Sequence, residues 1–355
     1  MKILLTIDSL SFGGAQRVVT ELANYFDDKG YELYLLIIHP NTNRYKINST
    51  VKLIEPKMGR ERLNKIIFIP YSILFMRRNI KRIKPDIIFN FIFSSFFLFI
   101  TIDLIHIKYI SIRNNPNKLQ KQDSLWFRKF IFKKAHRIIA QTKYAANIIR
   151  NQTDIENVDI IPNPVRKVKQ YNIKQDNTIL NIGRLINGKG YKDLIYIFSR
   201  LQAKSWRLQI VGDGPIREEL EQYAEKLNIR DKIDFEGFQT DLDKYLSKAK
   251  IFAFTSYSEG FPNALLEAMA FPIPCISYNC NAGPSELIND NINGFLIPTG
   301  DKEKFINKLD LLISDSKLRE KFKKNAESIK SNYSLEIIGY RYLELFKHDL
   351  YDRQK

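Results

Sequence analysis

Short apolar segments alternate with amphipathic segments of helical length along the whole chain. The apolar segments lie at residues 2–7, 31–38, 86–91, 108–112, 137–141, 158–162, 178–184, 207–212, 232–237, 250–256, 272–278 and 293–298. Runs that are apolar on both faces are typical of parallel strands covered by helices. Turn residues separate these runs from segments with helical spacing, such as 14–28 and 124–135. The alternation predicts an α/β fold with two doubly wound parallel sheets.

The length of the chain and a break in the pattern predict two domains. The chain has 355 residues, and a polar linker that starts at Pro162 follows the sixth apolar segment. We therefore expect one domain at residues 1–166 and another at 167–334. Residues 301–330 are expected to be helical. A last helix is expected over residues 335–350 and could cover either sheet.

The chain is basic, and its charge is unevenly distributed. Lys and Arg total 56 against 39 Asp and Glu, a formal net charge of +17. Residues 1–166 hold 27 of the basic and 13 of the acidic side chains, so the remaining 29 and 26 nearly cancel. A compositional bias would act on both halves alike, so the imbalance favours an electrostatic task for the first half. The candidate partners are an anionic membrane surface, a phosphorylated substrate and a nucleic acid.

The chain shows neither an export signal nor a membrane span. Residues 1–7 hold one lysine and an apolar run too short for a signal peptide, which predicts a cytoplasmic protein. The uncharged apolar stretch at 87–102 is shorter than the roughly 20 residues that a spanning helix needs. It is expected to be a buried strand followed by the start of a helix. Cys275 and Cys280 are expected to be buried thiols in a reducing compartment.

Glycines and cations follow several of the predicted strands, where open α/β sheets bind ligands. Gly13 and Gly14 come after the first strand and open a helix, whose free N–H groups suit a phosphate. A glycine turn that only joins a strand to a helix would give the same sequence. In the second half, Gly183 and Arg184 end a strand, and Lys189 comes five residues after the arginine. These two cations could neutralise a diphosphate, or they could be surface charges that merely lie close together.

The segment 258–267 carries the strongest signal. It reads Ser-Glu-Gly-Phe-Pro-Asn-Ala-Leu-Leu-Glu and places Glu259 ahead of a helix and Glu267 about two turns along it. Two carboxylates so placed can each accept hydrogen bonds from a pair of sugar hydroxyls, and the free N–H groups of the helix start can hold a phosphate. Acidic residues near a helix N-terminus are also ordinary complements of the helix dipole.

The ordered set of motifs resembles glycosyltransferase family 4. The set comprises Gly-Gly near the N-terminus, Gly-Arg-Leu with its following lysine, Val-Gly-Asp-Gly-Pro, and Glu-Gly-Phe-Pro-Asn-Ala-Leu-Leu-Glu. The combination is specific, although no single motif is, and the match covers nearly the whole chain. The resemblance implies a retaining GT-B enzyme with two Rossmann-like domains that face a central cleft. It further implies that residues 1–166 bind the acceptor, that residues 167–334 bind the donor, and that helix 335–355 returns to the first domain.

The resemblance also implies roles for single residues. Arg184 and Lys189 would bind the donor diphosphate, Glu259 would contact the donor sugar, and Glu267 would bind the ribose hydroxyls. The other implied donor-binding residues are Gly13, Gly14, Gly183, Gly212, Gly214, Gly260, Phe261, Pro262 and Asn263. No metal or other cofactor is expected, because the two cations suit the leaving diphosphate and no Asp-x-Asp cluster follows a strand at the expected place.

One position departs from the family pattern. Many members have a histidine after the fifth strand of the first domain, where this chain reads Ile112, Arg113, Asn114. Arg113 is expected to occupy the histidine position and is a catalytic candidate, but the acid–base role of a histidine does not carry over to it. His106 lies in an apolar run and is expected to be a core histidine rather than a catalytic one.

Residues 57–84 concentrate positive charge among apolar side chains, with Glu61 as the single acid there before Asp86. The cations expected to face the membrane or the acceptor are Arg60, Arg62, Lys65, Arg77, Arg78, Lys81 and Arg82. A basic amphipathic segment can lie on anionic lipid, or it can be a solvated helix whose apolar side faces the core. We expect the first domain to dock peripherally on the inner face of the plasma membrane, where a lipid-linked acceptor is available.

The predicted activity is transfer of a hexose or N-acetylhexosamine from a nucleotide sugar to a polyprenyl-diphosphate-linked saccharide. The resemblance to the family favours a UDP-linked donor and a role in the synthesis of surface polysaccharides or glycan precursors. A non-hydrolysing sugar-nucleotide epimerase could share the architecture and the donor, but the paired glutamates and the basic first half argue against it. Nucleic-acid binding is disfavoured because the sequence contains no recognised nucleic-acid module.

Overall fold

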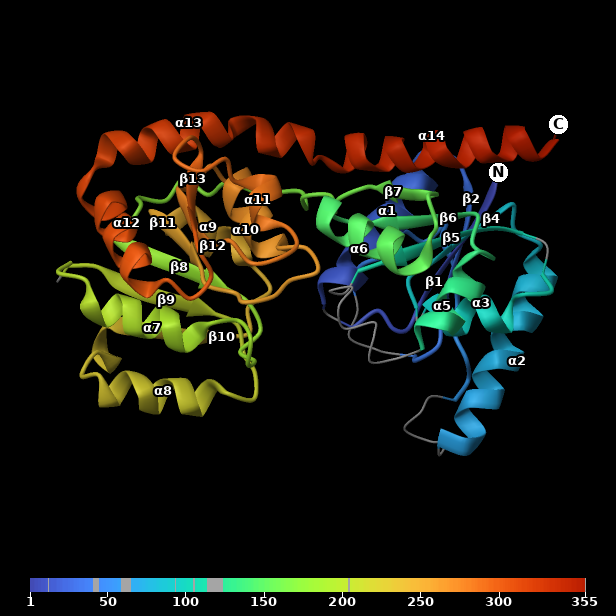
Figure 1. The fold of residues 1–355 in the computed structure, drawn as a ribbon, viewed down its shortest axis with the longest axis horizontal. Helices are drawn as coiled ribbons and strands as arrows, with labels where there is room; N and C mark the ends of the chain where they lie inside the picture. Colours follow the sequence, from blue (N-terminus) through green and yellow to red (C-terminus); the bar gives the residue numbers. More distant parts are fainter. Residues whose placement is uncertain are drawn as a thin grey trace. The chain divides into compact units, whose positions relative to one another are not determined.

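The computed structural model describes residues 1–11, 13–40, 45–58, 65–92, 94–104, 106–113, 124–203 and 205–354. The chain forms two compact units, which are Met1–Pro164 with Leu335–Lys355, and Val165–Ser334 (Figure 1). The division follows Pro164, inside the polar linker. Within the described ranges, no helix is both long enough and apolar enough to cross a membrane.

The first unit is built on a seven-stranded parallel sheet. Its strands are β1 (Lys2–Ile7), β2 (Glu32–Ile37), β3 (Lys52–Ile54), β4 (Ile87–Asn90), β5 (Ile107–Ile112), β6 (Arg137–Ala140) and β7 (Val158–Ile160). They lie in the order β3-β2-β1-β4-β5-β6-β7, and each neighbouring pair is parallel. The order reverses between β1 and β4, as in a doubly wound sheet.

Helices cover both faces of this sheet. On one face lie α1 (Gly14–Asp28) and α14 (Leu335–Gln354), and on the other lie α2 (Lys65–Ile83), α3 (Ser94–Ile100), α5 (Leu125–Phe132) and α6 (Lys143–Thr153). Side chains of a strand point alternately to the two faces, so Ile3 and Leu5 pack with α1 while Leu4 packs with α2. Strand β1 is apolar at nearly every position because neither of its faces meets water.

The last helix completes the core of the first unit although it is distant in sequence. Ile338, Tyr342 and Phe346 of α14 are fully buried against α1 and the sheet. The ring of Phe346 meets the ring of Tyr109 edge-on, with centroids 4.7 Å apart, and lies 5.8 Å from the ring of Phe26. Residues 335–354 are therefore part of the first unit.

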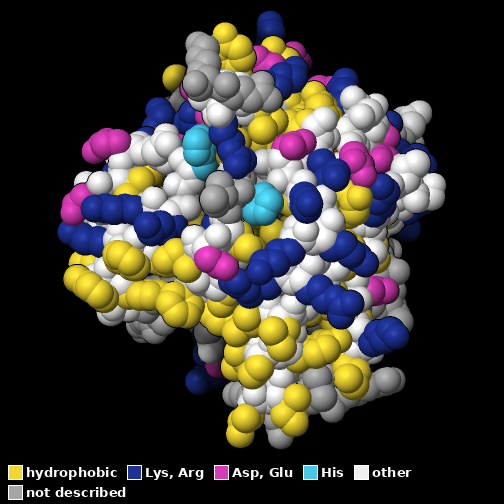
Figure 2. Space-filling view, turned by 90° about the vertical axis from the view of Figure 1, so that its right-hand side faces the viewer, with side chains coloured by type: hydrophobic (Ala, Val, Ile, Leu, Met, Phe, Trp, Pro, Cys, Tyr) yellow, Lys and Arg dark blue, Asp and Glu magenta, His cyan; other side chains and the backbone are white. Residues whose placement is uncertain are grey.

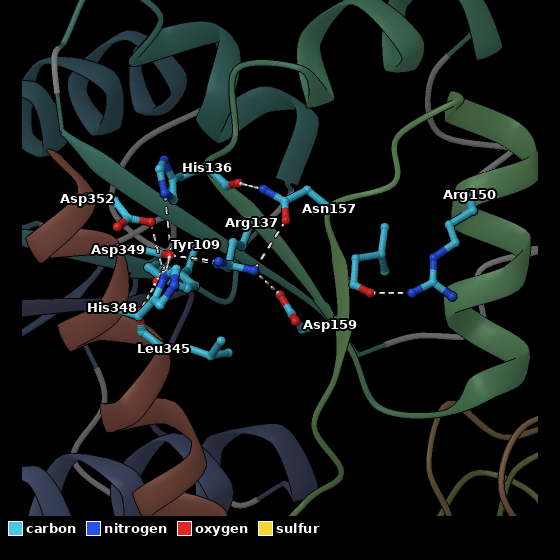
Figure 3. A network of polar contacts seen from close by, with 11 residues as sticks. Tyr109, His136, Arg137, Arg150, Asn157, Asp159, Leu345, His348, Asp349 and Asp352 are labelled. Carbon is cyan, nitrogen blue, oxygen red and sulfur yellow. Dashed lines mark hydrogen bonds and ion pairs between the residues drawn. The ribbon is translucent and has the colours of Figure 1, made fainter. Parts of the chain in front are cut away.

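A polar network fixes the C-terminal part of α14 to the sheet (Figure 3). The carboxylate of Asp349, which is 1% exposed, accepts hydrogen bonds from Arg137 Nε at 2.6 Å, Arg137 Nη2 at 2.7 Å and the hydroxyl of Tyr109. His136 and His348 contact the same carboxylate at 3.4 and 3.2 Å. Burial alone would raise the pKa of Asp349, but the hydrogen bonds from these groups outweigh it and hold the pKa well below its usual range.

The second unit contains a six-stranded parallel sheet. Its strands are β8 (Thr178–Ile182), β9 (Arg207–Val211), β10 (Ile233–Gly237), β11 (Ile251–Phe254), β12 (Cys275–Tyr278) and β13 (Gly294–Ile297). They lie in the order β10-β9-β8-β11-β12-β13, again with parallel neighbours. The order reverses between β8 and β11, which is the switch point of this sheet.

Helices also cover both faces of the second sheet. They are α7 (Tyr191–Arg200), α8 (Arg217–Lys226), the 3₁₀ turn η1 (Arg230–Lys232), α9 (Leu242–Lys248), α10 (Asn263–Ala270), α11 (Pro284–Leu287), α12 (Lys302–Ser314) and α13 (Ser316–Asn332). The core on one face includes α7, α8 and α12, and the core on the other includes α9 and α10. Cys275 and Cys280 are free and buried, as predicted.

The predicted pair of doubly wound parallel sheets is confirmed, with two differences in detail. Strand β3 was not predicted from the sequence. The helical region predicted over 301–330 is two helices, because Asp315 has an extended backbone between them. Its side chain accepts a hydrogen bond from the N–H of Leu318 at 2.9 Å, so the same residue caps the second helix.

Candidate active site

Two loops meet at the switch point of the second sheet. Strand β8 ends at Ile182 and its neighbour β11 ends at Phe254, and the loops that follow carry Lys189 and Glu259. The N–H of Tyr257 donates to the carbonyl oxygen of Gly188 at 2.9 Å, which ties the two loops together. Open α/β sheets bind ligands at such a switch point, beyond the carboxyl ends of the strands.

Lys189 and Glu259 form an ion pair at this place. The ammonium of Lys189 contacts the two carboxylate oxygens of Glu259 at 2.6 and 2.8 Å. Glu259 is 8% exposed, and the side chain of Lys189 is 26% exposed. The structure thus brings together two residues for which the sequence predicted contacts with different parts of the donor, the diphosphate for Lys189 and the sugar for Glu259. A partly buried pair of this kind holds a cation in a fixed position at the strand ends.

Arg184 lies on the first of these loops and is exposed. The backbone on either side of it is fixed, since the N–H of Gly183 donates to Val211 O at 3.0 Å and the N–H of Leu185 donates to Asp213 O at 2.9 Å. Within the described part of the chain, the guanidinium of Arg184 forms no ion pair. The site therefore presents one cation that is held by Glu259 and one that faces solvent.

Glycines at this edge allow the backbone to pack more closely than any side chain would permit. Gly190 caps α7 with φ +68°, and a Cβ atom built there would lie 1.9 Å from the carbonyl oxygen of Thr255. Gly212 has φ +139°, and a Cβ atom there would lie 1.9 Å from the carbonyl oxygen of Gly183. The loops after β8, β9 and β11 are therefore packed backbone to backbone around the site.

Replacing Gly190 by alanine tests this close packing. Gly190→Ala is expected to destabilise the second unit by more than about 2 kcal/mol, because both the φ angle and the contact with Thr255 are unfavourable. Gly188→Ala is the matched control, since Gly188 has φ +92° but open space around a built Cβ atom. It is expected to cost about 1 kcal/mol, from the φ angle alone. If urea unfolding showed the same loss of stability in Gly190→Ala and Gly188→Ala, the contact with Thr255 would be unimportant.

Glu267 lies on α10, close to the same loops, and is 6% exposed. Its Oε2 accepts a hydrogen bond from Arg166 Nε at 2.9 Å. The guanidinium of Arg166 also forms an ion pair with Asp243. Burial lowers the pKa of Arg166, but the two carboxylates outweigh that effect and raise it. The carboxylate of Glu267 is therefore held in place by a partly buried arginine.

Helix α10 begins at this site without a side-chain cap. Pro262 occupies the cap position, and its side chain makes no capping hydrogen bond. The N–H of Asn263 donates to Phe261 O at 3.0 Å, so this group of the predicted Gly260–Asn263 set has a partner within the loop. The uncapped first turn is suited to a phosphate oxygen because of its aligned N–H groups.

In the first unit, Gly13 and Gly14 lie at the start of α1, beyond the carboxyl end of β1. Gly13 is the N-cap residue with extended backbone, and it has no side chain that could cap the helix. Strands β1 and β4 form the switch point of this sheet, where Thr6 donates to Asn90 Oδ1 at 2.7 Å. The predicted glycine turn thus lies at the ligand-binding edge of its own sheet.

Arg113 directly follows β5, at the same edge of the first sheet. Its guanidinium lies over the ring of Phe91, 4.6 Å from the ring centroid, and its Nε donates to Ser111 Oγ at 2.9 Å. Nη1 donates to Asn163 Oδ1. His106 lies at the other end of β5, where its Nδ1 is 3.0 Å from Pro85 O. Arg113 is therefore a fixed cation at the ligand-binding edge, and His106 is not near that edge.

Comparison with protein families identifies the chain. The model "Glycosyltransferase Family 4" matches residues 12–167, and the model "Glycosyl transferases group 1" matches residues 166–329. Together the two matches leave only the ends of the chain uncovered. The chain is a family 4 glycosyltransferase.

Curated relatives of this glycosyltransferase extend over nearly its whole length. The amylovoran biosynthesis glycosyltransferase AmsD of Erwinia amylovora is 24% identical over 356 residues, which cover 95% of this chain and 97% of AmsD. A Campylobacter jejuni enzyme is 25% identical over 357 residues, which cover 97% of this chain and 98% of the enzyme. That enzyme is the GalNAc-alpha-(1->4)-GalNAc-alpha-(1->3)-diNAcBac-PP-undecaprenol alpha-1,4-N-acetyl-D-galactosaminyltransferase.

A solved structure confirms the fold of the glycosyltransferase. A TarM variant of S. aureus, solved with UDP, alpha-GlcNAc-glycerol and Fondaparinux, superposes with a TM-score of 0.80 at 17% identity. The match covers 98% of this chain and 100% of that one. The predicted GT-B fold class is therefore confirmed.

Sequence reasoning missed Arg166 and Asp243 of the glycosyltransferase. Arg166 was placed in the linker at the end of the first domain, whereas the structure includes it in the second unit, bonded to Glu267. Asp243 comes from α9 and meets Arg166 only in the folded chain. A basic residue in the linker was visible in the sequence, but nothing there indicated its carboxylate partners.

The basic segment of the glycosyltransferase is only partly described. Arg60, Arg62 and the side chain of Lys65, the first residue of α2, lie outside what the structure describes. Arg77 forms a bidentate pair with Asp103, at 2.7 and 2.6 Å, which holds the pKa of that carboxyl at about 2. The other predicted membrane-facing cations, Arg78, Lys81 and Arg82, are exposed on α2.

The described residues of the glycosyltransferase contain no group of three or more His, Cys, Asp or Glu side chains that could hold a metal ion. Cys280 lies near the Lys189–Glu259 pair, and its burial and the charge of Glu259 raise the pKa of its thiol to about 12. Cys280 is therefore a thiol rather than a thiolate at neutral pH, which makes it a poor nucleophile.

Proposed function

We propose that this glycosyltransferase moves a hexose or N-acetylhexosamine, with retention at the anomeric carbon, from a nucleotide sugar to a lipid-linked saccharide. The observation that carries the proposal is the ion pair between Lys189 and Glu259 at the switch point of the second sheet. Exposed Arg184 lies on the same loop as the lysine, and Glu267 lies on the helix after the glutamate. Cations for a diphosphate and carboxylates for sugar hydroxyls are the groups that a nucleotide sugar requires.

The names of similar proteins support the choice of donor and acceptor. The Campylobacter jejuni relative is named for an undecaprenol-linked acceptor and an α-1,4-linked product. The TarM structure was solved with UDP and α-GlcNAc-glycerol. We therefore propose a UDP-linked donor, a polyprenyl-diphosphate-linked acceptor and an α-linked product. Because the common UDP-hexoses are α-linked to the diphosphate, an α-linked product corresponds to retention.

In the proposed reaction, the bond between the anomeric carbon and the diphosphate oxygen breaks while the acceptor hydroxyl oxygen bonds to the same face of that carbon. Negative charge grows on the leaving diphosphate, where Arg184, Lys189 and the first turn of α10 stabilise it. The proton of the acceptor hydroxyl passes to the leaving diphosphate, so no protein nucleophile is required. Glu259 and Glu267 hold the sugar and the ribose, and Arg166 fixes the position of Glu267.

Arg113 is proposed to add positive charge at the ligand-binding edge of the first unit. Its guanidinium is held by Ser111, Asn163 and the ring of Phe91, so its position is fixed before any ligand binds. A guanidinium remains protonated in proteins. Arg113 therefore acts in this proposal as an electrostatic group and not as a general base.

The proposed place of action is the inner face of the plasma membrane. A polyprenyl-diphosphate acceptor is confined to a bilayer, so the enzyme must reach the membrane surface to use it. The first unit holds most of the excess positive charge, which favours approach to anionic lipid. Nucleic acid is not a proposed partner.

Transfer is expected to need no divalent metal. Arg184 and Lys189 can balance the charge that a metal ion would otherwise neutralise on the diphosphate. Initial rates should therefore be equal after exhaustive treatment with EDTA and after addition of Mg²⁺ or Mn²⁺. A rate that falls with EDTA and recovers with Mn²⁺ would contradict metal-independent transfer.

A screen of donors tests the proposed function. UDP- and GDP-linked hexoses and N-acetylhexosamines, each labelled in the sugar, are incubated with the protein and a short polyprenyl-diphosphate saccharide. The expected result is movement of label from one donor into the lipid extract, with an α-linkage in the product by proton NMR. A β-linked product would overturn retention. Absence of transfer from every donor by the folded protein would overturn the choice of substrates.

A further inference from the structure

Large apolar side chains are exposed on three helices of the first unit and the turn after one of them. They are Ile66, Ile67, Ile69 and Leu74 of α2, Phe96, Phe99 and Ile102 of α3 and its following turn, and Leu125, Trp126 and Phe130 of α5. We call this set the apolar patch. Ile66 is 82% exposed and Trp126 is 76% exposed. Single exposed apolar residues are common, but such a concentration on neighbouring elements marks an interaction surface.

Contacts between the three helices make the patch continuous. Arg77 of α2 donates to the carbonyl oxygen of Ile100 and pairs with Asp103, just beyond the end of α3. Helices α3 and α5 meet through the rings of Phe99 and Phe127, whose centroids are 5.9 Å apart. Figure 2 shows hydrophobic side chains gathered on the lower half of this face of the unit, below a region rich in lysine and arginine.

The core of the first unit does not account for these side chains. Helix α2 already buries a regular apolar stripe that includes Phe68, Met76 and Ile80. Ile66 and Leu74 lie on the outward side of the same helix, in its first half. When a helix is apolar on its outward side as well as on the side that faces the core, its outward side contacts a further apolar partner in the functioning protein.

Cations border the apolar patch, and acids are missing from its helices. Arg78, Lys81 and Arg82 are exposed in the second half of α2, and Lys134 follows α5 with its ammonium 5.9 Å from the ring centroid of Phe130. Over their described lengths, α2 and α5 contain no Asp or Glu. Apolar side chains bordered by lysine and arginine are the pattern of surfaces that lie in the interface of an anionic bilayer.

We propose that the apolar patch inserts into the headgroup region of an anionic bilayer, with the exposed cations of α2 and Lys134 at the depth of the lipid phosphates. This inference deepens the proposed function, because a lipid-linked acceptor requires the enzyme to reach a bilayer. Trp126 is the central anchor, since tryptophan favours the interface between lipid and water. A second copy of the chain is the less favourable neighbour, because a symmetric contact would set the same cations against each other.

Vesicle binding by the full chain tests the proposal. The vesicles are phosphatidylcholine alone, or equal parts of phosphatidylcholine and phosphatidylglycerol, without donor or acceptor. The wild-type protein is expected to bind the anionic vesicles and to keep part of that binding at high salt, because insertion of apolar groups is not screened. Equal sedimentation with neutral and anionic vesicles at low salt would overturn the proposal.

Substitutions separate the apolar and the electrostatic parts. Trp126→Ser with Phe130→Ser is expected to weaken binding roughly tenfold or more, and Arg78→Gln with Lys81→Gln and Arg82→Gln about a hundredfold on anionic vesicles. The matched charge control replaces Lys317, Lys321 and Lys324, which are exposed on α13, by glutamine. It is expected to bind vesicles with an affinity close to that of the wild type. Variants of the patch that bind like the wild type would overturn the proposal.

Tryptophan fluorescence gives a readout that does not depend on sedimentation. The chain has two tryptophans, and Trp206 is buried, so a Trp206→Phe variant reports Trp126 alone. Emission is expected to shift to shorter wavelength when anionic vesicles are added. An unchanged spectrum, or a wild-type dimer in light scattering that Trp126→Ser dissociates, would assign the patch to something other than lipid. Because neither donor nor acceptor is present, failure here is separate from failure of sugar transfer.

Discussion

Lys189→Ala is expected to lower kcat about a hundredfold or more. Lys189 places an ammonium at the switch point of the second sheet, 2.6 and 2.8 Å from the oxygens of Glu259. The substitution removes a positive charge where the leaving diphosphate becomes negative and leaves a buried carboxylate without its partner. Loss of one preorganised group of this kind costs about 2.7–4 kcal/mol of barrier. Initial rates at saturating donor and acceptor measure the effect.

Lys192→Ala is the matched control for that measurement. Lys192 is exposed on α7 and pairs with Glu219 at 2.5 Å, at side-chain exposures of 53% and 50%. A surface pair contributes only about 0–1 kcal/mol, so the variant should fold and transfer sugar nearly as the wild type does. Arg184→Ala is expected to resemble Lys189→Ala. A wild-type kcat in Lys189→Ala, or an effect confined to KM, would show that the lysine does not stabilise the transition state.

Asp349→Ala is expected to destabilise the first unit by about 1.5–3 kcal/mol, because it removes the buried carboxylate that accepts hydrogen bonds from Arg137 and Tyr109. The Asp349 carboxylate is buried and bonded to Arg137 and Tyr109. It attaches the last helix to strands that lie more than two hundred residues earlier in the chain. Urea unfolding, monitored by a spectroscopic signal from the first unit, measures the decrease in the free energy of unfolding. Asp352→Ala, at an exposed position three residues later, is the control and should cost far less.

The loss of stability caused by Asp349→Ala should become smaller as the pH falls. The pKa of Asp349 in the folded protein is held below its usual range, and an unfolded aspartate has a pKa of about 3.9. The carboxylate therefore contributes stability above the unfolded pKa, and this contribution is lost as pH falls towards the folded pKa. The difference in the free energy of unfolding between the wild type and Asp349→Ala should therefore become smaller at acidic pH. A constant difference from neutral to acid pH would contradict the network as its origin.

Apolar runs predicted the two sheets because parallel strands covered on both faces have few positions open to polar residues. Strand β3 escaped prediction for the opposite reason. It has three residues, begins with exposed Lys52 and pairs with one neighbour at the edge of the sheet. Asp315 could have indicated the break within 301–330, since Asp is a common N-cap, but the surrounding sequence also fits one continuous helix.

Contacts within the candidate site were harder to predict than its members. Lys189 and Glu259 were placed in the sequence by their motifs, yet their direct ion pair depends on two strands that are neighbours only in the folded sheet. The same holds for Arg166, which comes from the linker and contacts Glu267. Sequence motifs show which residue types are present at strand ends, whereas the strand order determines which of them meet.

The basic segment shows how two alternative interpretations can apply to one helix. The sequence left open whether its apolar residues face lipid or the core. In the structure, Phe68 and Ile80 lie in the core while Ile66 and Leu74 are exposed. The contribution of Trp126 to the same surface could not be predicted from the segment, because α5 lies sixty residues further along the chain.

Whether consumption of the donor requires the acceptor distinguishes a glycosyltransferase from an epimerase. The purified chain is incubated with its preferred UDP-sugar, with and without a polyprenyl-diphosphate saccharide, and both released UDP and the remaining donor are quantified. Stoichiometric UDP release and loss of donor are expected only when the acceptor is present, with little activity in Lys189→Ala. Conversion of the donor into another nucleotide sugar without any acceptor would contradict sugar transfer and indicate an epimerase.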